Sequence, residues 1–206
     1  TMTDAVAIFG TGGFAREVAC VMHDLGRGNQ IVAFHEPDEV FEARELLGVP
    51  VRPQSAFEST RHRAVVGIGN PASREKVVSE LPPETVFDTL VHPTAVVSQW
   101  VQLGAGSVIC AGAVLTCQIT IGSHCQLNLN TTVGHDCTFG DFCTVAPGTN
   151  ISGNVDFGTR VDVGTQAAFR QHLRICDDVV IGMGAVVVKD IIEPGTYVGV
   201  PAKKVG

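Results

Sequence analysis

The C-terminal half of the chain repeats an apolar residue at every sixth position. From Val91 to Val187, all seventeen of these positions hold Val, Leu, Ile or Phe. If about 45% of residues are apolar, such an unbroken run would arise by chance on the order of once in a million. A helix or a flat strand does not repeat with this period, whereas a hexapeptide β-helix does. The pattern therefore predicts a β-helix domain with a C-terminal tail over residues 91–206.

Further features of the repeat predict how its coils are built. Small residues recur at a second inward position, where we expect Cys125, Cys137 and Cys143 to fill the core. Three hexads form one coil, and a strand spacing of about 4.8 Å gives about five coils in a prism on the order of 25 Å tall. Glycine directly follows the apolar residue in seven hexads, and we expect these glycines at corners that need a positive φ angle: Gly104, Gly122, Gly134, Gly140, Gly158, Gly164 and Gly182.

Residues 1–90 follow a different pattern, in which short apolar runs alternate with helical periodicity. We expect strands at 6–9, 31–34 and 64–68, and helices at 14–25, 39–47 and 71–81. Strands that alternate with helices predict a parallel sheet, here a Rossmann-like α/β domain. Its first turn, residues 10–13 (GTGG), follows a strand and opens a helix, as a phosphate-binding turn does. A tight turn without a ligand is the alternative.

Composition and charge narrow the possible partners. The 206 residues are 45% hydrophobic and 17% charged, which suits a folded chain with a substantial core. The net charge of −7, without a cluster of five or more Lys and Arg residues, argues against nucleic acid as a partner. The apolar runs are too short to predict membrane insertion, and we expect no signal peptide. Seven cysteines without CxxC spacing fit reduced thiols in a cytoplasmic protein.

Several segments carry a resemblance to a known family. They are residues 127–137 (LNLNTTVGHDC), 145–155 (VAPGTNISGNV), 181–190 (IGMGAVVVKD) and 199–204 (GVPAKK). In these segments, and in its two-part organisation, the chain resembles the PglD/NeuD-like family of bacterial sugar acyltransferases. Members of this family place a Rossmann-like nucleotide-sugar-binding domain before a trimeric left-handed β-helix. The resemblance implies a left-handed coil, acetyl-CoA as co-substrate, no metal, and a homotrimer with its active site between neighbouring β-helices.

The resemblance also implies a catalytic pair. His135 matches the general base of the family, and Asp136 matches the acidic residue that raises its basicity. A sugar amine must lose a proton as it attacks a thioester, and imidazole is the side chain that titrates near neutral pH. His135 also falls two residues past an inward aliphatic residue, at an expected corner. A solvated corner histidine is the alternative, and we expect the nearby His124 to be structural.

The remaining site residues follow from the repeat or from the family. Gly153 comes 18 residues after His135, so it is expected directly above it on the next coil. There its N–H would hold the thioester oxygen as charge develops, although an ordinary corner glycine is the alternative. Matching to the family implies contacts with CoA at Thr144, Thr165 and Met183, and contacts with a nucleotide-sugar at Gly12, Gly13, Phe14, His35, Glu36, Gly69 and Asn70.

The function implied is transfer of acetyl from acetyl-CoA to the amine, at C4 by family habit, of a nucleotide-linked amino-deoxysugar for surface glycan synthesis. An alternative is O-acetylation of sialic acid or another sugar hydroxyl. A non-catalytic nucleotide-sugar-binding or assembly subunit is an alternative of another class. The repeat alone also allows a structural spacer, or a carbonic-anhydrase-like metal site with several histidines at subunit faces.

Overall fold

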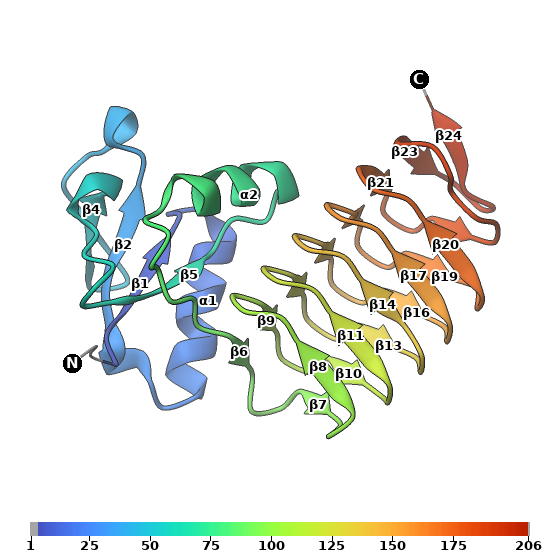
Figure 1. Cartoon of the computed structure of the whole chain (residues 1–206), viewed down its shortest axis with the longest axis horizontal. Helices are drawn as coiled ribbons and strands as arrows, with labels where there is room; N and C mark the ends of the chain where they lie inside the picture. Colours follow the sequence, from blue (N-terminus) through green and yellow to red (C-terminus); the bar gives the residue numbers. More distant parts are fainter. Residues whose placement is uncertain (1–3, 206) are drawn as a thin grey trace.

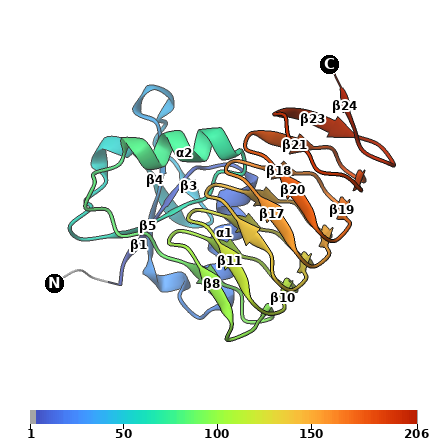
Figure 2. The ribbon, with the colours of Figure 1, turned by 45° about the vertical axis from the view of Figure 1, so that its right-hand side comes forward.

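The computed structural model describes residues 4–205 and contains two parts that lie side by side (Figure 1). An N-terminal α/β unit packs beside the first coils of a β-helix, which extends away from it toward the C-terminus. A turned view shows the coils stacked in regular order along the prism (Figure 2). Within the described residues, no helix is both long and apolar enough to cross a lipid bilayer.

The N-terminal unit is a five-stranded sheet in the order β3-β4-β2-β1-β5, parallel except for the β3–β4 hairpin. Alternate residues of β1 face opposite sides of the sheet, so Ile8 packs with α1 while Phe9 packs with Val77 of α2. The predicted strands are confirmed, as are the helices predicted at 14–25 and 71–81. The elements are β1 (Val6–Phe9), α1 (Gly13–Asp24), β2 (Ile31–Glu36), β3 (Glu45–Leu46), β4 (Val49–Pro53), β5 (Arg63–Val66) and α2 (Pro71–Glu80), with 3-10 turns at Gly28–Gln30, Asp38–Val40 and Gln54–Ala56.

The helix predicted at 39–47 is wrong. The segment holds the end of a 3-10 turn, an irregular stretch and β3. Leu47 and Gly48 have φ angles of 53° and 75°, and they close a two-residue turn in which Leu46 pairs with Val49. Pairing with a neighbouring strand therefore overrides the helical periodicity of this short stretch.

The β-helix has three faces, each a sheet whose strands come from successive coils. The first face holds β6 (Leu90–Val91), β9 (Val108–Ile109), β12 (Gln126–Leu127), β15 (Thr144–Val145), β18 (Asp162–Val163) and β21 (Val179–Ile181), followed by β23 (Gly195–Val198) and the antiparallel β24 (Lys203–Val205). The second holds β7 (Val96–Val97), β10 (Val114–Leu115), β13 (Thr132–Val133), β16 (Asn150–Ile151), β19 (Ala168–Phe169) and β22 (Val186–Val187). The third holds β8 (Val101–Leu103), β11 (Ile119–Ile121), β14 (Thr138–Phe139), β17 (Val155–Phe157) and β20 (Leu173–Ile175).

Apart from β24, each β-helix strand pairs in parallel with the strand one coil away. Thr132 lies beside Asn150 and bonds to it through its side chain, a separation of 18 residues. The predicted left-handed parallel β-helix after an α/β unit is confirmed. The inward cysteines are core residues as predicted, and their thiols donate to backbone carbonyls of the next coil: Cys125 to Gly140, Cys137 to Ser152 and Cys143 to Gly158.

The recurring hexad glycines serve a purpose different from the one expected. Positive φ angles fall two residues later, for example at 58° on Asp136 and 61° on Phe142. A Cβ on Gly104 would lie 2.4 Å from the backbone of Gly122, and other hexad glycines meet the next coil as closely. These positions therefore need glycine because the coils stack closely there.

Candidate active site

His135 lies at the corner between the second and third faces, two residues after the end of β13. Its side chain is 59% exposed, and its Nδ1 atom is 2.7 Å from Oδ2 of Asp136. The left-handed φ of Asp136, 58°, turns the carboxylate back onto the preceding ring. Because an ionised carboxylate only accepts hydrogen bonds, Nδ1 carries the proton and Nε2 keeps a free lone pair. The corner thus presents an imidazole oriented as a proton acceptor.

Gly153 packs directly against this imidazole. A Cβ at Gly153 would lie 2.6 Å from Nε2 of His135, so a larger residue does not fit without moving the ring. Gly153 is buried, and its N–H donates to no acceptor within residues 4–205. An unpaired backbone donor beside the base is suited to hold a developing negative oxygen. The structure therefore brings His135, Asp136 and Gly153 together.

Thr165 and Met183 lie at a different corner, between the first and second faces. They stack on successive coils, where the N–H of Gly184 donates to the Thr165 carbonyl at 2.8 Å. Met183 is 77% exposed. The whole second face separates this corner from His135, so the structure does not bring the two groups together within one chain.

Thr144 lies on the first face and points into the N-terminal unit. It is buried, and its Oγ1 donates to the Gly69 carbonyl at 2.6 Å while accepting from Nη2 of Arg74 at 3.0 Å. The hydroxyl therefore has no free hydrogen for CoA, and the contact implied by the resemblance is not supported by this geometry.

The glycine-rich turn opens α1 at the carboxyl edge of the sheet. Gly12 and Gly13 are exposed, and a Cβ on either would meet no atom within 4 Å. No side chain caps the helix start, so the first-turn amides remain available for an anion. Phe14 is half-buried and packs into the core beneath the turn.

Residues 67–70, which follow β5, lie against this turn. A Cβ on Gly67 would be 2.6 Å from the Cα of Ala15, so the segment and the start of α1 are in contact. Gly69 is half-exposed, and Asn70 caps α2 by accepting from the Ser73 N–H at 2.9 Å. The structure thus brings Gly12, Gly13 and Phe14 close to Gly69 and Asn70, at the edge where α/β sheets bind nucleotides.

His35 and Glu36, at the end of β2, have internal partners. The His35 ring is 2% exposed, stacks on Phe9, and lies 3.0 Å from the Pro53 carbonyl through Nδ1. Burial lowers its pKa. Glu36 accepts two bonds from Arg44, which hold the pKa of Glu36 at about 2, and another from the Thr11 hydroxyl at 3.2 Å. Through its bond to Thr11, Glu36 therefore stabilises the glycine-rich turn.

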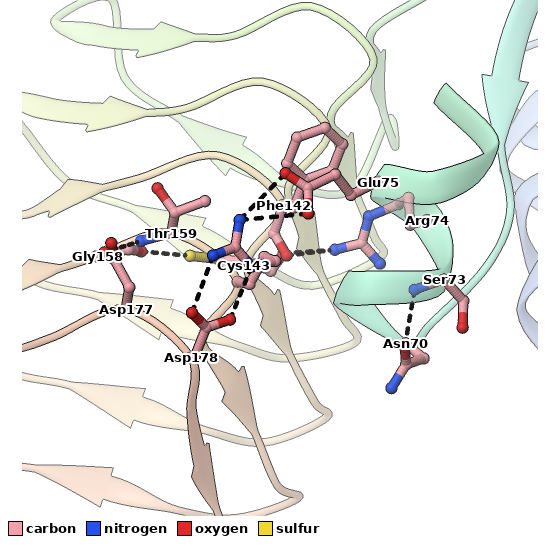
Figure 3. Close-up of polar contacts among 11 residues, drawn as sticks. Asn70, Ser73, Arg74, Glu75, Phe142, Cys143, Gly158, Thr159, Asp177 and Asp178 are labelled. Atoms are coloured by element: carbon pink, nitrogen blue, oxygen red, sulfur yellow. Dashed lines mark hydrogen bonds and ion pairs between the residues drawn. The ribbon is translucent and has the colours of Figure 1, made fainter. Parts of the chain in front are cut away.

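Sequence reasoning missed Arg74 of α2, which has no exposed surface. Figure 3 shows its side chain reaching from α2 toward Phe142 on the β-helix. Burial lowers the pKa of Arg74 to about 10, which leaves the guanidinium charged at neutral pH. Apart from the Thr144 hydroxyl, its partners on the β-helix are backbone carbonyls distant in the sequence, so no local pattern marks it.

The other histidine of the repeat has a structural setting. His124 is 6% exposed, and its ring stacks on Phe142 and meets Phe87 edge-on. Burial lowers its pKa to about 4, so the ring is neutral at pH 7. Among residues 4–205, no group of three or more His, Cys, Asp and Glu side chains is placed to hold a metal ion.

Comparisons with known proteins cover both parts of the chain. Residues 5–81 match the family model described as the PglD N-terminal domain. The acetyltransferase domain of PglB from Neisseria gonorrhoeae, solved with acetyl coenzyme A, is 30% identical. That match has a TM-score of 0.90 and covers 98% of this chain and 99% of the other.

Two further structures are similar over their full length. A mutant of perosamine N-acetyltransferase from Caulobacter crescentus, with histidine changed to asparagine and solved with CoA and GDP-perosamine, is 31% identical. Its TM-score is 0.91, over 98% of this chain and 97% of the other. WeeI from Acinetobacter baumannii is 29% identical with a TM-score of 0.90, and each chain is covered completely.

Proposed function

Because this chain belongs to the PglD/NeuD-like family of acetyl-CoA-dependent sugar N-acetyltransferases, we propose that it acetylates the C4 amine of a nucleotide-linked amino-deoxysugar. The product would be an N-acetylated precursor of a surface glycan, made in the cytoplasm. The observation that carries this proposal is the cluster of His135, Asp136 and Gly153, in which a free imidazole nitrogen and a free backbone donor lie side by side.

The cluster accounts for each proton in the reaction. As the sugar nitrogen attacks the thioester carbon, Nε2 of His135 takes a proton from that nitrogen. Asp136 holds Nδ1–H and stabilises the imidazolium that forms. The carbonyl oxygen gains negative charge and accepts from the Gly153 N–H. Collapse of the tetrahedral intermediate breaks the carbon–sulfur bond, and His135 returns its proton to the leaving CoA sulfur.

We assign acceptor binding to the N-terminal unit. The open amides at Gly12 and Gly13 suit the diphosphate of a nucleotide-sugar, because a helix start attracts anions. The half-exposed Gly69 and the exposed Asn70 would then contact the sugar. The GDP-perosamine bound to the similar Caulobacter crescentus enzyme supports an acceptor of this chemical class.

We further propose a homotrimer in which each site is completed by a second copy. The N-terminal unit covers the first face, whereas His135 lies at the opposite corner, between the second and third faces. His135 of one chain would therefore act as the base for a sugar bound by another chain. The second face is the better subunit interface, because its outward column is short or aliphatic (Val96, Val114, Thr132, Asn150, Ala168 and Val186), whereas that of the third face is exposed and mostly polar (Gln102, Thr120, Thr138, Asp156 and Arg174).

A thiol-release assay tests the reaction. Acetyl-CoA is offered with UDP-, GDP- and dTDP-linked 4-amino sugars and, separately, with free sialic acid. We expect turnover with a nucleotide-linked amine and none with sialic acid. Preferential turnover of sialic acid would replace the proposal with O-acetylation.

Mixing inactive variants tests the shared site. A His135→Asn chain is refolded with a Gly12→Asp chain, whose carboxylate repels the diphosphate. If base and acceptor segments come from different copies, trimers assembled at random from an equal mixture should recover activity in about a quarter of all sites. Mixtures that stay inactive, although mass spectrometry detects mixed trimers, would show that each site uses a single chain.

A further inference from the structure

We propose that Arg74, together with Thr144, is a positioning residue that holds the acceptor-binding segment 67–70 against the β-helix and so sets where the sugar amine lies. The identity of the ligand rests on the function proposed above. The contacts that carry the inference lie within the chain itself.

Arg74 connects the two parts of the molecule through its whole guanidinium group. Nη1 donates to two carbonyls of the segment itself, those of Ile68 at 2.6 Å and Gly69 at 2.9 Å. The other two nitrogens donate to the β-helix: Nε to His124 O at 2.8 Å, and Nη2 to Phe142 O at 2.7 Å, Cys143 O at 3.2 Å and Thr144 Oγ1 at 3.0 Å. One planar group thus fixes the segment relative to two successive coils.

Side chains of the first face add contacts along the same segment. Gln126 donates to the Val66 carbonyl at 3.1 Å, and Thr144, one coil further on, donates to the Gly69 carbonyl at 2.6 Å. The opposite side of the segment is also constrained, since Gly67 lies against the Cα of Ala15. The segment is therefore held between the diphosphate-binding turn and the β-helix.

The use of a charged residue at this contact indicates that Arg74 positions segment 67–70 and does more than attach the two parts to each other. Within residues 4–205 Arg74 makes no ion pair; carbonyl and hydroxyl oxygens accept all its hydrogen bonds, and Asp162 adds an electrostatic attraction without a direct contact. Burying a cation in this way is costly, and apolar residues of similar volume often stabilise an interface as well or better. What the guanidinium adds is direction, because its donors lie in a rigid plane. Transfer to a thioester depends on such direction, since a misplacement of about 1 Å costs on the order of a hundredfold in rate.

A second contact between the same two parts provides a matched control. Arg160 of the β-helix donates to Glu75 of α2 at 3.1 Å and to Asp178 at 2.7 Å. Figure 3 labels these two acceptors. Glu75 neighbours Arg74 in the sequence, but its side chain is 40% exposed, and within residues 4–205 its carboxylate forms hydrogen bonds with Arg160 and none with residues 67–70. Glu75→Gln therefore weakens the attachment of the two parts without releasing the segment.

The experiment compares Thr144→Val, Arg74→Lys and Glu75→Gln with the wild type. Steady-state kinetics give KM for the nucleotide amino sugar and for acetyl-CoA, and hydrogen exchange without substrate follows the amides of residues 67–70. Thr144→Val removes one hydroxyl and should raise the acceptor KM about five- to tenfold. Arg74→Lys should raise it about a hundredfold, because a single ammonium cannot span both parts. In both variants KM for acetyl-CoA should stay unchanged, and hydrogen exchange at residues 67–70 should become faster. Glu75→Gln should change neither the acceptor KM nor the exchange rates.

Two results would overturn the inference. One is an acceptor KM for Thr144→Val within twofold of the wild type; the other is an equal rise in both KM values, which would indicate general loosening. If Arg74→Lys does not fold, Thr144→Val still decides. If the wild type acetylates no nucleotide amino sugar, the proposed function fails. The positioning role of Arg74 and Thr144 is then tested by hydrogen exchange alone, and unchanged exchange rates at residues 67–70 in Thr144→Val would refute it.

Discussion

Two histidines of the β-helix lie at different corners and have opposite surroundings. His135 is exposed and is oriented by Asp136. His124 is enclosed by Phe87 and Phe142, and its Nδ1 has no partner within the part of the chain that the structure describes. The repeat places each histidine at a corner, but of these two corners the N-terminal unit covers only that of His124. The chemistry of a corner residue is therefore decided by what packs on that corner.

The largest expected effect separates the two histidines by activity. His135→Asn should lower kcat about a thousandfold, because the general base is lost, while the unfolding temperature stays near that of the wild type. His124→Phe should keep most of the activity. Steady-state kinetics with acetyl-CoA and the acceptor measure both. An equal fall in kcat in the two variants would contradict the different roles given to the two histidines.

The next effect is on stability and concerns His124. Its folded pKa of about 4 lies below the 6.5 of the unfolded chain, so the unfolded chain binds the proton first as the pH falls. Stability is therefore unaffected above pH 6.5 and declines between pH 6.5 and 4, by roughly 3 kcal/mol in total. Arg74 adds to the lowering of the pKa, and Asp141 opposes it.

Urea unfolding between pH 7.5 and 4.5 measures this decline. His124→Phe should flatten it, and phenylalanine suits the corner because Phe142 has a similar φ of 61°. His172→Phe is the matched control, since His172 is exposed and has a φ of 60°. A wild-type slope that survives His124→Phe would assign the pH dependence to other groups.

A smaller effect concerns the partner of the base. Asp136→Asn should lower kcat about ten- to a hundredfold, because the imidazolium loses its stabilising charge and the ring its preferred tautomer. Asp141→Asn, at the His124 corner, removes a carboxylate that accepts from the Ser123 N–H, and should leave kcat unchanged. The pH profile of kcat provides the readout. A profile identical to that of the wild type in Asp136→Asn would mean that His135 works alone.

The smallest effect concerns the core beneath the His135 corner. Cys137 is fully buried and its thiol donates to the Ser152 carbonyl at 3.3 Å. Cys137→Ala should cost about 1 kcal/mol in the free energy of unfolding without changing kcat. Denaturant unfolding and the thiol-release assay measure the two quantities. A large fall in kcat would give this cysteine a part in the chemistry.

The sequence predicts the β-helix well because its information is local and repeated. One inward residue per hexad sets the register, so the placement of Gly153 above His135 follows by counting 18 residues. The contact between His135 and Asp136 does not follow, since neighbours on an extended chain diverge and only the φ of 58° turns them together. Arg74 is unpredictable for another reason: three of its partners on the β-helix are backbone carbonyls 50 to 69 residues away, and every residue type supplies a carbonyl.

The strict pairing of residues 18 apart has a consequence for how the length of this chain can change. Inserting six residues in the middle of the β-helix would keep every aliphatic residue inside yet turn each later side chain to the next face. Thr144 would then face away from Gly69, and the corner of Met183 would move around the prism. A gain or loss of 18 residues keeps each later side chain on its face but moves it by one coil along the axis, relative to the residues before the change. Natural variation in length should therefore collect at the corners and the tail, where added residues leave the angular order of the coils intact.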